Sequence, residues 1–314
     1  YASRWPKAIP FHPGWVVASE IIRAESASLE GPYEFREVVF AARGHGWWDG
    51  RSAHNPRVVC QGDGCYLFYI GSTHPMASPR PNEPLPVEDP RVRVALWRKR
   101  IGIATAPSPS GPWARPDWPA LETRPDHYDS WITSNPSACR DLDGSWLLLY
   151  KGRSTLGTVH APERGPMCLG VARAQHPSGP WERGNEAVIP SDGLSQVEDP
   201  FVWRSERGFE AIFKDMGREL TGYHHALIRA FSEDGRKWSL DADPLFAGRE
   251  VVWPDGTSQE LGSLERPSLV FQKGLSTHLL AAGADGPGWF QNMTRSFIVL
   301  AESPRAETIS HGVA

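Results

Sequence analysis

The chain has 314 residues, a formal net charge of -4, 40% hydrophobic residues and 22% charged residues. This balance is typical of an ordinary globular protein, and the small net charge without a basic run argues against nucleic-acid binding. No apolar stretch is long enough to cross a bilayer, and none resembles the apolar region of a signal peptide. We therefore expect neither a nucleic-acid nor a membrane partner.

A proline-marked segment, followed by two apolar stretches separated by a turn, recurs along the chain. Its four copies begin at His54-Asn55-Pro56, Ser134-Asn135-Pro136, Glu198-Asp199-Pro200 and Glu265-Arg266-Pro267. Each copy predicts an inner strand, a tight turn and a second strand.

A second pattern fits a third strand and the turn that follows it. Its copies are Ile101 to Trp113, Leu169 to Trp181, Ala226 to Trp238, Ile21 to Tyr33, and a fifth that begins at Phe297. Short strands at even spacing, with turn residues between them, predict an all-β fold, a five-bladed β-propeller of four-stranded antiparallel blades. Because no linker interrupts the repeats, we expect residues 1–314 to form a single domain.

Four cysteines are too few for a disulfide scaffold. Cys60 and Cys65 flank the first hairpin turn, where they either bridge its two strands or remain free, half-buried thiols. A bridge would indicate an oxidising compartment, and a leader removed ahead of Tyr1 would agree with it. These features favour a secreted or periplasmic location over a cytoplasmic one.

Alternating strand directions place the long connections together on one face of the propeller. They include residues 71 to 100, 152 to 168, 214 to 224 and 282 to 296, and long loops on a rigid scaffold usually carry function. Trp47, Trp48, Trp131 and Trp289 lie on this face outside the repeat, whereas we expect Trp113, Trp181 and Trp238 to fill gaps between blades. Flat rings pack against sugar C–H faces, so carbohydrate is the predicted ligand.

The inner strands are expected to bring the residues before each proline to the propeller axis. This ring contains His54, Asn55, Ser134, Asn135, Glu198, Asp199, Glu265 and Arg266, and the second strands add Lys151, Arg153, Lys214 and Asp215. So many ionisable groups at one place must be paired or used. The cations, with His54 and His74, either hold a uronate, sulfate or phosphate, or neutralise the neighbouring carboxylates.

An acidic residue at the proline that opens each inner strand resembles a motif of five-bladed glycoside hydrolases. These are chiefly family 43, with relatives in families 32, 62 and 117, and the related phosphorylases of family 130. The resemblance covers nearly the whole chain as architecture. It implies an aspartate before the first proline as general base, a second aspartate that tunes pKa, and a glutamate two residues before the third proline as the acid.

Glu198, in Val197-Glu198-Asp199-Pro200, matches the position of the acid. Asn55 and Asn135 stand where the two aspartates would be, and an amide cannot accept a proton at neutral pH. Like charges nearby would keep Glu198 protonated, although strand alternation points Asp199 to the opposite side.

Glycoside cleavage usually needs a second carboxyl group. We favour Asp49, in the loop before His54, as the general base, with Glu265, one blade after Glu198, as the alternative. Both also have structural interpretations: Asp49 as the cap of a turn beside Gly50, and Glu265 as the ion-pair partner of Arg266.

These expectations predict an exo-acting glycoside hydrolase that removes a terminal, acidic or modified sugar by carboxylic acid/base catalysis. Two alternatives stay open: an inverting glycoside phosphorylase, and a non-catalytic sugar-binding propeller, which the two asparagines make credible. We predict no metal and no cofactor, because no ligand spacing recurs among the histidines. The predicted substrate-binding residues are Trp47, Trp48, His54, Asn55, Trp131, Asn135, Lys151, Arg153, Asp199, Lys214 and Arg266.

Overall fold

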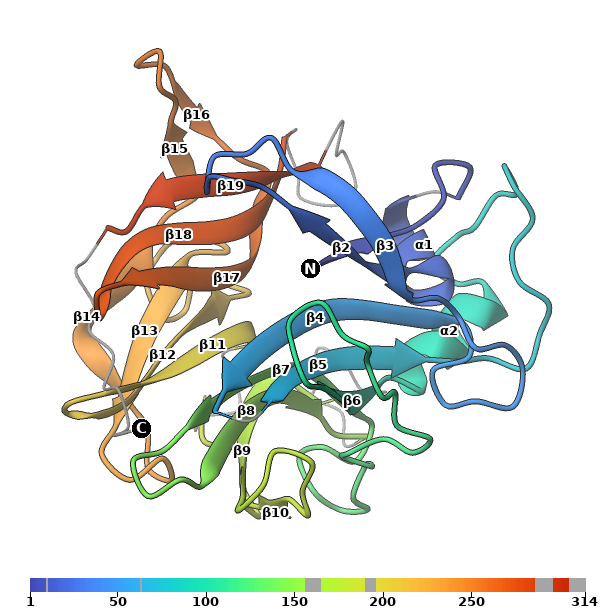
Figure 1. The fold of residues 1–314 in the computed structure, drawn as a ribbon, viewed down its shortest axis with the longest axis horizontal. Helices are drawn as coiled ribbons and strands as arrows, with labels where there is room; N and C mark the ends of the chain where they lie inside the picture. The colour runs from blue at the N-terminus through green and yellow to red at the C-terminus, as the bar shows by residue number, and fades with distance from the viewer. Residues whose placement is uncertain (10, 63, 156–164, 190–195, 286–295, 305–314) are drawn as a thin grey trace. The chain divides into compact units, whose positions relative to one another are not determined.

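The computed structural model describes residues 1–9, 11–62, 64–155, 165–189, 196–285 and 296–304. Within these ranges the chain forms antiparallel strands and two short helices (Figure 1), α1 (Phe11–Ala18) and α2 (Pro90–Trp97). The strands are β1 (Ala2–Arg4), β2 (Glu20–Glu25), β3 (Glu34–Phe40), β4 (Ser52–Gln61), β5 (Gly64–Ser72), β6 (Arg100–Ala106), β7 (Ile132–Arg140), β8 (Trp146–Arg153), β9 (Cys168–Ala174), β10 (Glu182–Arg183), β11 (Val197–Ser205), β12 (Gly208–Asp215), β13 (Leu227–Ser232), β14 (Ser239–Ala247), β15 (Glu250–Val252), β16 (Ser258–Glu260), β17 (Ser263–Gln272), β18 (Leu275–Ala284) and β19 (Ser296–Glu302). Neither helix has the length and apolarity that a membrane span requires, among the residues described.

The all-β fold class predicted from the sequence is confirmed. The sheets have the strand orders β1-β2-β3, β4-β5-β6, β10-β9-β8-β7, β11-β12-β13-β14 and β17-β18-β19, and β15-β16 is a separate hairpin. Two of these sheets reach the predicted four strands. Beside β4-β5-β6, the place of a fourth strand is taken by isolated bridges from Ile101 to Leu121 and from Thr105 to Ala114.

The proline-marked inner strands share one backbone irregularity just before the proline. Asn55, Asn135, Asp199 and Arg266 have φ angles of 55°, 52°, 61° and 57°. In β4, β11 and β17 the pairing with the next strand shifts at this point, as in a β-bulge. Asn and Asp adopt this left-handed conformation more readily than other residues with a side chain, so backbone geometry accounts for three of the four identities.

Backbone contacts divide the chain into two compact units. Unit 1 consists of Tyr1–Pro136, Gly152–Thr155 and Ala174–Glu182, and unit 2 consists of Ser137–Lys151, Leu156–Arg173 and Arg183–Ala314. Each unit has its own core. That of unit 1 includes Ile21, Phe40, Leu67 and Tyr69, and that of unit 2 includes Leu147, Leu149, Phe209 and Phe213. The expectation of a single domain stays a prediction.

The connection after β5, expected as a loop over residues 71 to 100, contains helix α2. The Asp89 carboxylate accepts a hydrogen bond from the backbone N–H of Arg91 at 2.8 Å and caps the helix, and Pro90 lies in its first turn. Buried Val92 and Ala95 pack in one apolar cluster with residues of α1. The Asp-Pro pair is a helix-start signal that the sequence already carried.

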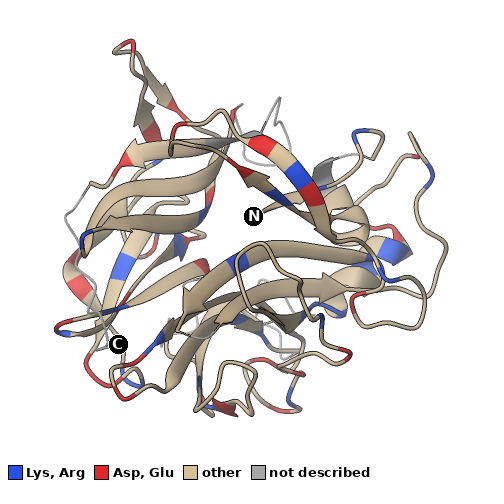
Figure 2. Ribbon diagram, in the orientation of Figure 1, with Lys and Arg blue, Asp and Glu red and all other residues tan. Residues whose placement is uncertain are grey.

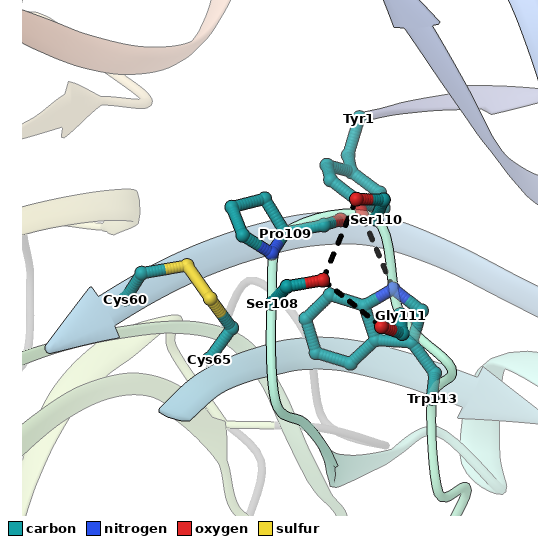
Figure 3. The surroundings of a disulfide bond; sticks show 8 residues. All are labelled: Tyr1, Cys60, Cys65, Ser108, Pro109, Ser110, Gly111 and Trp113. Carbon is teal, nitrogen blue, oxygen red and sulfur yellow. Dashed lines mark hydrogen bonds between the residues drawn. A yellow bond between two sulfur atoms is a disulfide. The ribbon is translucent and has the colours of Figure 1, made fainter. Parts of the chain in front are cut away.

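A disulfide joins Cys60 of β4 to Cys65 of β5, which confirms the bridged alternative (Figure 3). In the Ser-Gly-Pro turn beside it, Gly111 has a φ of 88°, a conformation that favours glycine. The Tyr1 hydroxyl donates to the carbonyl of Pro109 and accepts a hydrogen bond from Trp113 Nε1 at 3.1 Å (Figure 3). Trp113 therefore anchors the first strand, in line with the structural role expected of this periodic tryptophan.

The edge strand β3 carries alternating acidic and basic side chains (Figure 2). Glu37 pairs with Arg23 at 2.7 Å, and Arg36 pairs with Glu25 at 3.0 Å. Charged side chains along an edge strand oppose pairing with another sheet.

Candidate functional site

Unit 2 gathers five of the predicted site residues around a sixth, the buried Lys214. Lys214, at the end of β12, is 0% exposed, and its Nζ lies 2.9 Å from Glu198 Oε1 and 4.0 Å from Asp199 Oδ2. It also donates a hydrogen bond to Glu265 Oε2. Both carboxylates of β11 and one of β17 thus face a single ammonium group. We call these residues, together with Lys151 and Arg266, the ionic cluster.

The other two cations of the ionic cluster also pair with carboxylates. Lys151 Nζ lies 2.5 Å from Glu198 Oε2, and Arg266 Nε lies 3.2 Å from Asp199 Oδ1. The backbone N–H of Arg266 also donates to Asp199 Oδ2 at 3.1 Å. Glu265 therefore pairs with Lys214, while Arg266 pairs with Asp199. Three of the predicted cations thus pair with carboxylates in the structure, and their use in binding an anionic ligand stays a prediction.

The bulge in β11 turns two consecutive carboxylates toward the same point. One oxygen each from Glu198, Asp199 and Glu265 lie within 4.8 Å of one another. The expectation that Glu198 and Asp199 diverge is wrong, because the left-handed Asp199 interrupts strand alternation there. Three convergent carboxylates are a donor set that suits a cation, and here the Lys214 ammonium supplies positive charge to all three.

The two glutamates of the ionic cluster have opposite pKa shifts. Burial raises the pKa of Glu198, but Lys151, Lys214 and Arg266 outweigh burial and hold it well below its usual range. Burial also raises the pKa of Glu265, and the charges of Asp199 and Glu198 add to the effect against Lys214, so it reaches about 7. Glu198 is therefore ionised near neutral pH, whereas a large share of Glu265 is protonated. This order is the reverse of the one expected from the sequence.

His225 is a residue near the ionic cluster that the sequence analysis did not select. Its φ is 57°, and burial, Lys214 and Arg249 lower its pKa to about 4, so the ring is neutral at pH 7. The loop between Asp215 and His225 is fixed by Asp215, which is fully buried. Its carboxylate accepts hydrogen bonds from the backbone N–H groups of Gly217 at 3.1 Å and Leu220 at 3.3 Å. The sequence signal that could have selected His225 was its position in the connection that follows Lys214.

Asp49, the favoured general base, lies in unit 1 and is 0% exposed. Its Oδ1 accepts from Arg43 Nε at 2.8 Å, and its Oδ2 accepts from Arg115 Nε and from the Tyr69 hydroxyl, each at 2.8 Å. A carboxylate held by three donors is strongly oriented. These contacts favour a structural role, in which Asp49 holds two arginines and a tyrosine. The turn cap beside Gly50 and the use of Asp49 as a base both stay predictions.

The loop of Asp49 has a counterpart before the next inner strand. Asp129 stands six residues before Asn135, as Asp49 does before Asn55. It is also fully buried and accepts from Arg124 Nε at 3.0 Å. Each arginine also covers a ring: Arg43 lies 4.0 Å from the centre of Trp47, and Arg124 lies 5.3 Å from that of Tyr128. A repeated Arg–Asp pair supports a structural role for both aspartates.

Trp48 packs inside unit 1. Its ring centre lies 5.5 Å from that of Tyr69, and a Cβ atom added at Gly71 or Gly102 would come within 2.3 or 2.5 Å of its indole. These glycines make room for the ring, which favours a packing role over a binding role. The Arg153 guanidinium lies 5.5 Å from the ring centre of Trp131. Trp289 is outside the described residues.

The remaining predicted residues of unit 1 lie on the inner strands. His54 is 1% exposed, with its Nδ1 2.9 Å from the Ser52 hydroxyl and its ring edge-on to Trp15 at 5.3 Å. The backbone N–H of Asn55 donates to the Ser3 hydroxyl at 2.7 Å. Asn135 is 2% exposed. His54, Asn55 and Asn135 thus hold positions on their strands like that of Glu198–Asp199 on β11.

No protein-family model and no curated protein matches the chain. Among solved structures, a family 117 glycoside hydrolase produced by the marine bacterium Zobellia galactanivorans matches with a TM-score of 0.59 and 17% identity, over 90% of this chain and 70% of that one. A thermostable family-43 glycoside hydrolase matches with a TM-score of 0.55 and 14% identity, over 92% and 88% of the two chains. An endo-arabinase from Bacteroides thetaiotaomicron matches with a TM-score of 0.55 and 15% identity, over 90% and 85%. At these identities the likeness shows the fold, which is that of the propeller glycoside hydrolases.

Proposed function

We propose that the protein is an exo-acting glycoside hydrolase built as a single five-bladed propeller. The observation that carries this proposal is the pair of glutamates in the ionic cluster, whose pKa values are displaced in opposite directions. Neighbouring carboxyl groups with different protonation states provide the acid and the anion that glycoside cleavage requires. The shared fold with glycoside hydrolases supports the same conclusion.

The charge order favours Glu265 as the general acid and Glu198 as the ionised partner. In this scheme Glu265 transfers its proton to the glycosidic oxygen as the bond to the anomeric carbon breaks, and the Glu198 carboxylate attacks that carbon. Glu265 then takes a proton from water, whose oxygen displaces Glu198 from the sugar. One oxygen of Glu198 and one of Glu265 lie within 4.8 Å of each other, which leaves less room than the separation of about 6.5–9.5 Å at which inverting enzymes hold a water between their carboxyl groups. We therefore propose retention of configuration.

The other four residues of the ionic cluster enter this proposal as groups that support the two glutamates. Asp199 and Arg266 hold one another beside the two glutamates, and Lys151 and Lys214 set the charge of Glu198. Because these cations are paired, their contacts do not favour an acidic over a neutral sugar. The long connections predicted between the strands support an enclosed pocket, and hence release of single sugars.

The test is incubation of the purified chain with arabino-oligosaccharides and with oligosaccharides that end in a uronic acid, with and without inorganic phosphate. We expect a free monosaccharide from the first time points, released as the anomer of the substrate in proton NMR. Sugar 1-phosphate as the main product would show a phosphorylase instead. Binding without any product would identify a non-catalytic sugar-binding protein.

A further inference from the structure

Two exposed tryptophans of unit 1 stand on loops that one arginine ties together. Trp118 is 81% exposed and Trp47 is 39% exposed. The Arg43 guanidinium lies 4.0 Å from the ring centre of Trp47, and its Nη1 lies 3.3 Å from Oδ1 of Asp117, the neighbour of Trp118. Trp47 thus stacks on the arginine that pairs with the chain neighbour of Trp118.

The Trp118 loop is held firmly although its ring faces solvent. Ala114 exchanges backbone hydrogen bonds with Thr105 on one side of the loop, and on the other side Ala120 N–H donates to the Ile101 carbonyl at 2.7 Å. Between them, Arg43 Nη2 donates to the Pro116 carbonyl at 2.7 Å. An aromatic ring presented by an ordered loop loses little conformational freedom when it binds a ligand.

Asp49 holds the Trp47 loop and the Trp118 loop through one arginine from each. Its carboxylate accepts from Arg43 on one loop and from Arg115 on the other, and Arg115 Nη1 donates back to the Ala41 carbonyl at 2.6 Å. The counterpart loop at Asp129 has its own Arg–Asp pair, but the ring beside it, Tyr128, is only partly exposed. The first loop therefore has the same internal support and adds a solvent-facing aromatic surface.

We propose that Trp47 and Trp118 form a carbohydrate-binding platform on unit 1, on which a polysaccharide chain lies with its C–H faces against the rings. Arg43 and the 68% exposed carboxylate of Asp117 supply a donor and an acceptor for sugar hydroxyls beside the aromatic surface. This combination suits a sugar chain better than an apolar protein surface. The proposal deepens the proposed function, on whose carbohydrate ligand it rests, and makes Asp49 a positioning residue.

Affinity electrophoresis of the full chain tests the platform. Native gels are cast with linear arabinan, galactan, xylan or polygalacturonate, and the retardation of each variant gives its affinity. We expect at least one polysaccharide to retard the protein, Trp118→Ala to weaken that binding by roughly tenfold, which corresponds to about 1.4 kcal/mol, and Trp118→Tyr to restore much of it. Trp97→Ala, which removes a 55% exposed tryptophan on α2, is the matched control and should bind normally.

Three results of the gels would overturn the platform: no retardation in any gel, equal retardation of Trp118→Ala and the unchanged protein, or an equal loss of binding in Trp97→Ala. A change from dimer to monomer on Trp118→Ala, seen by analytical ultracentrifugation, would also overturn it by assigning the surface to a second copy of the chain. Turnover of oligosaccharides is measured separately. Turnover without polysaccharide binding would reject the platform alone, and binding without turnover would reject the hydrolase proposal alone.

Discussion

Asp49 and Glu265 are both buried carboxylates near the start of inner strands, but their surroundings differ. Asp49 accepts hydrogen bonds from two arginines and a tyrosine hydroxyl, each at 2.8 Å. Glu265 shares Lys214 with Glu198 and faces the charge of Asp199. The carboxylate with three strong donors holds two loops in place, whereas the carboxylates that share one lysine have pKa values shifted in opposite directions. Burial alone therefore does not distinguish a structural acid from a reactive one.

The variant Glu265→Gln keeps the shape of the side chain and removes its proton donor. We expect kcat to fall roughly 10²- to 10⁴-fold. The loss should be smaller for substrates with a good leaving group, such as a dinitrophenyl glycoside, because their departure needs little protonation. Both are measured by steady-state kinetics.

Asp141→Asn is the matched control for Glu265→Gln. Asp141 pairs with Arg173 at 2.7 Å and Arg204 at 3.0 Å in unit 2, and it lies outside the ionic cluster. This variant should keep its turnover. Full activity of Glu265→Gln on all substrates would remove Glu265 from the mechanism.

Replacement of Asp49 by Asn, compared with the same change at Asp129, tests the structural role of these two aspartates. Each leaves buried arginine charge without its partner, so we expect the free energy of unfolding to fall by about 3–5 kcal/mol in both variants. Urea denaturation measures the loss, and kinetics at low temperature measures turnover of the folded fraction. A selective loss of turnover in Asp49→Asn, with Asp129→Asn unaffected, would restore Asp49 as the general base.

The pH dependence separates the two glutamates. With Glu265 as the acid, we expect kcat/KM to fall as the pH rises through about 7, where that carboxyl group loses its proton. Depression of the Glu198 pKa keeps its anion available on the acid side. A kcat/KM profile that stays level from about pH 6 to about pH 9 would contradict these roles.

The free energy of unfolding should depend on pH through Glu265 and Glu198, in opposite directions. Because the pKa of Glu265 is raised above its ordinary value of 4.5 to about 7, its contribution to folding is largest at low pH and is lost as the pH rises between these values. The contribution of Glu198, whose pKa is lowered, is present above 4.5 and is lost as the pH falls below it. Urea titrations across this range should show a smaller decline toward pH 7 in Glu265→Gln than in the unchanged protein.

The smallest expected change in stability concerns the Cys60–Cys65 disulfide of unit 1. Replacing both Cys60 and Cys65 by Ser removes a bridge that closes a short loop, so the free energy of unfolding should fall by about 2 kcal/mol. Alkylation of the denatured, unreduced chain should modify Cys139 and Cys168 but not the bridged pair. Mass spectrometry that finds all four cysteines modified would contradict the disulfide.

The repeat in the sequence was sufficient to predict the strands and to select Lys151, Glu198, Lys214 and Glu265, because equivalent positions of successive copies converge. It did not predict the order of protonation. That order depends on which carboxylate Lys151 reaches, a matter of side-chain geometry that a linear pattern does not contain.

Two features that differ from the expectations drawn from the sequence nevertheless have recognisable sequence signals. Asp89-Pro90 marks the start of α2, and the equal spacing of Asp49 and Asp129 from the following Asn-Pro pairs marks a repeated loop. The shared direction of Glu198 and Asp199 had no such signal, since it follows from the backbone conformation of a single residue.

That single residue has a wider consequence. A regular strand offers a ligand only every second side chain, and a binding surface built from it is correspondingly sparse. By inserting one left-handed residue ahead of Pro200, β11 delivers two neighbouring acids to one place without a longer loop. Two neighbouring side chains of one strand can therefore face the same ligand. Substitutions at Asp199 would change the backbone conformation there, and with it the direction of the Glu198 carboxylate.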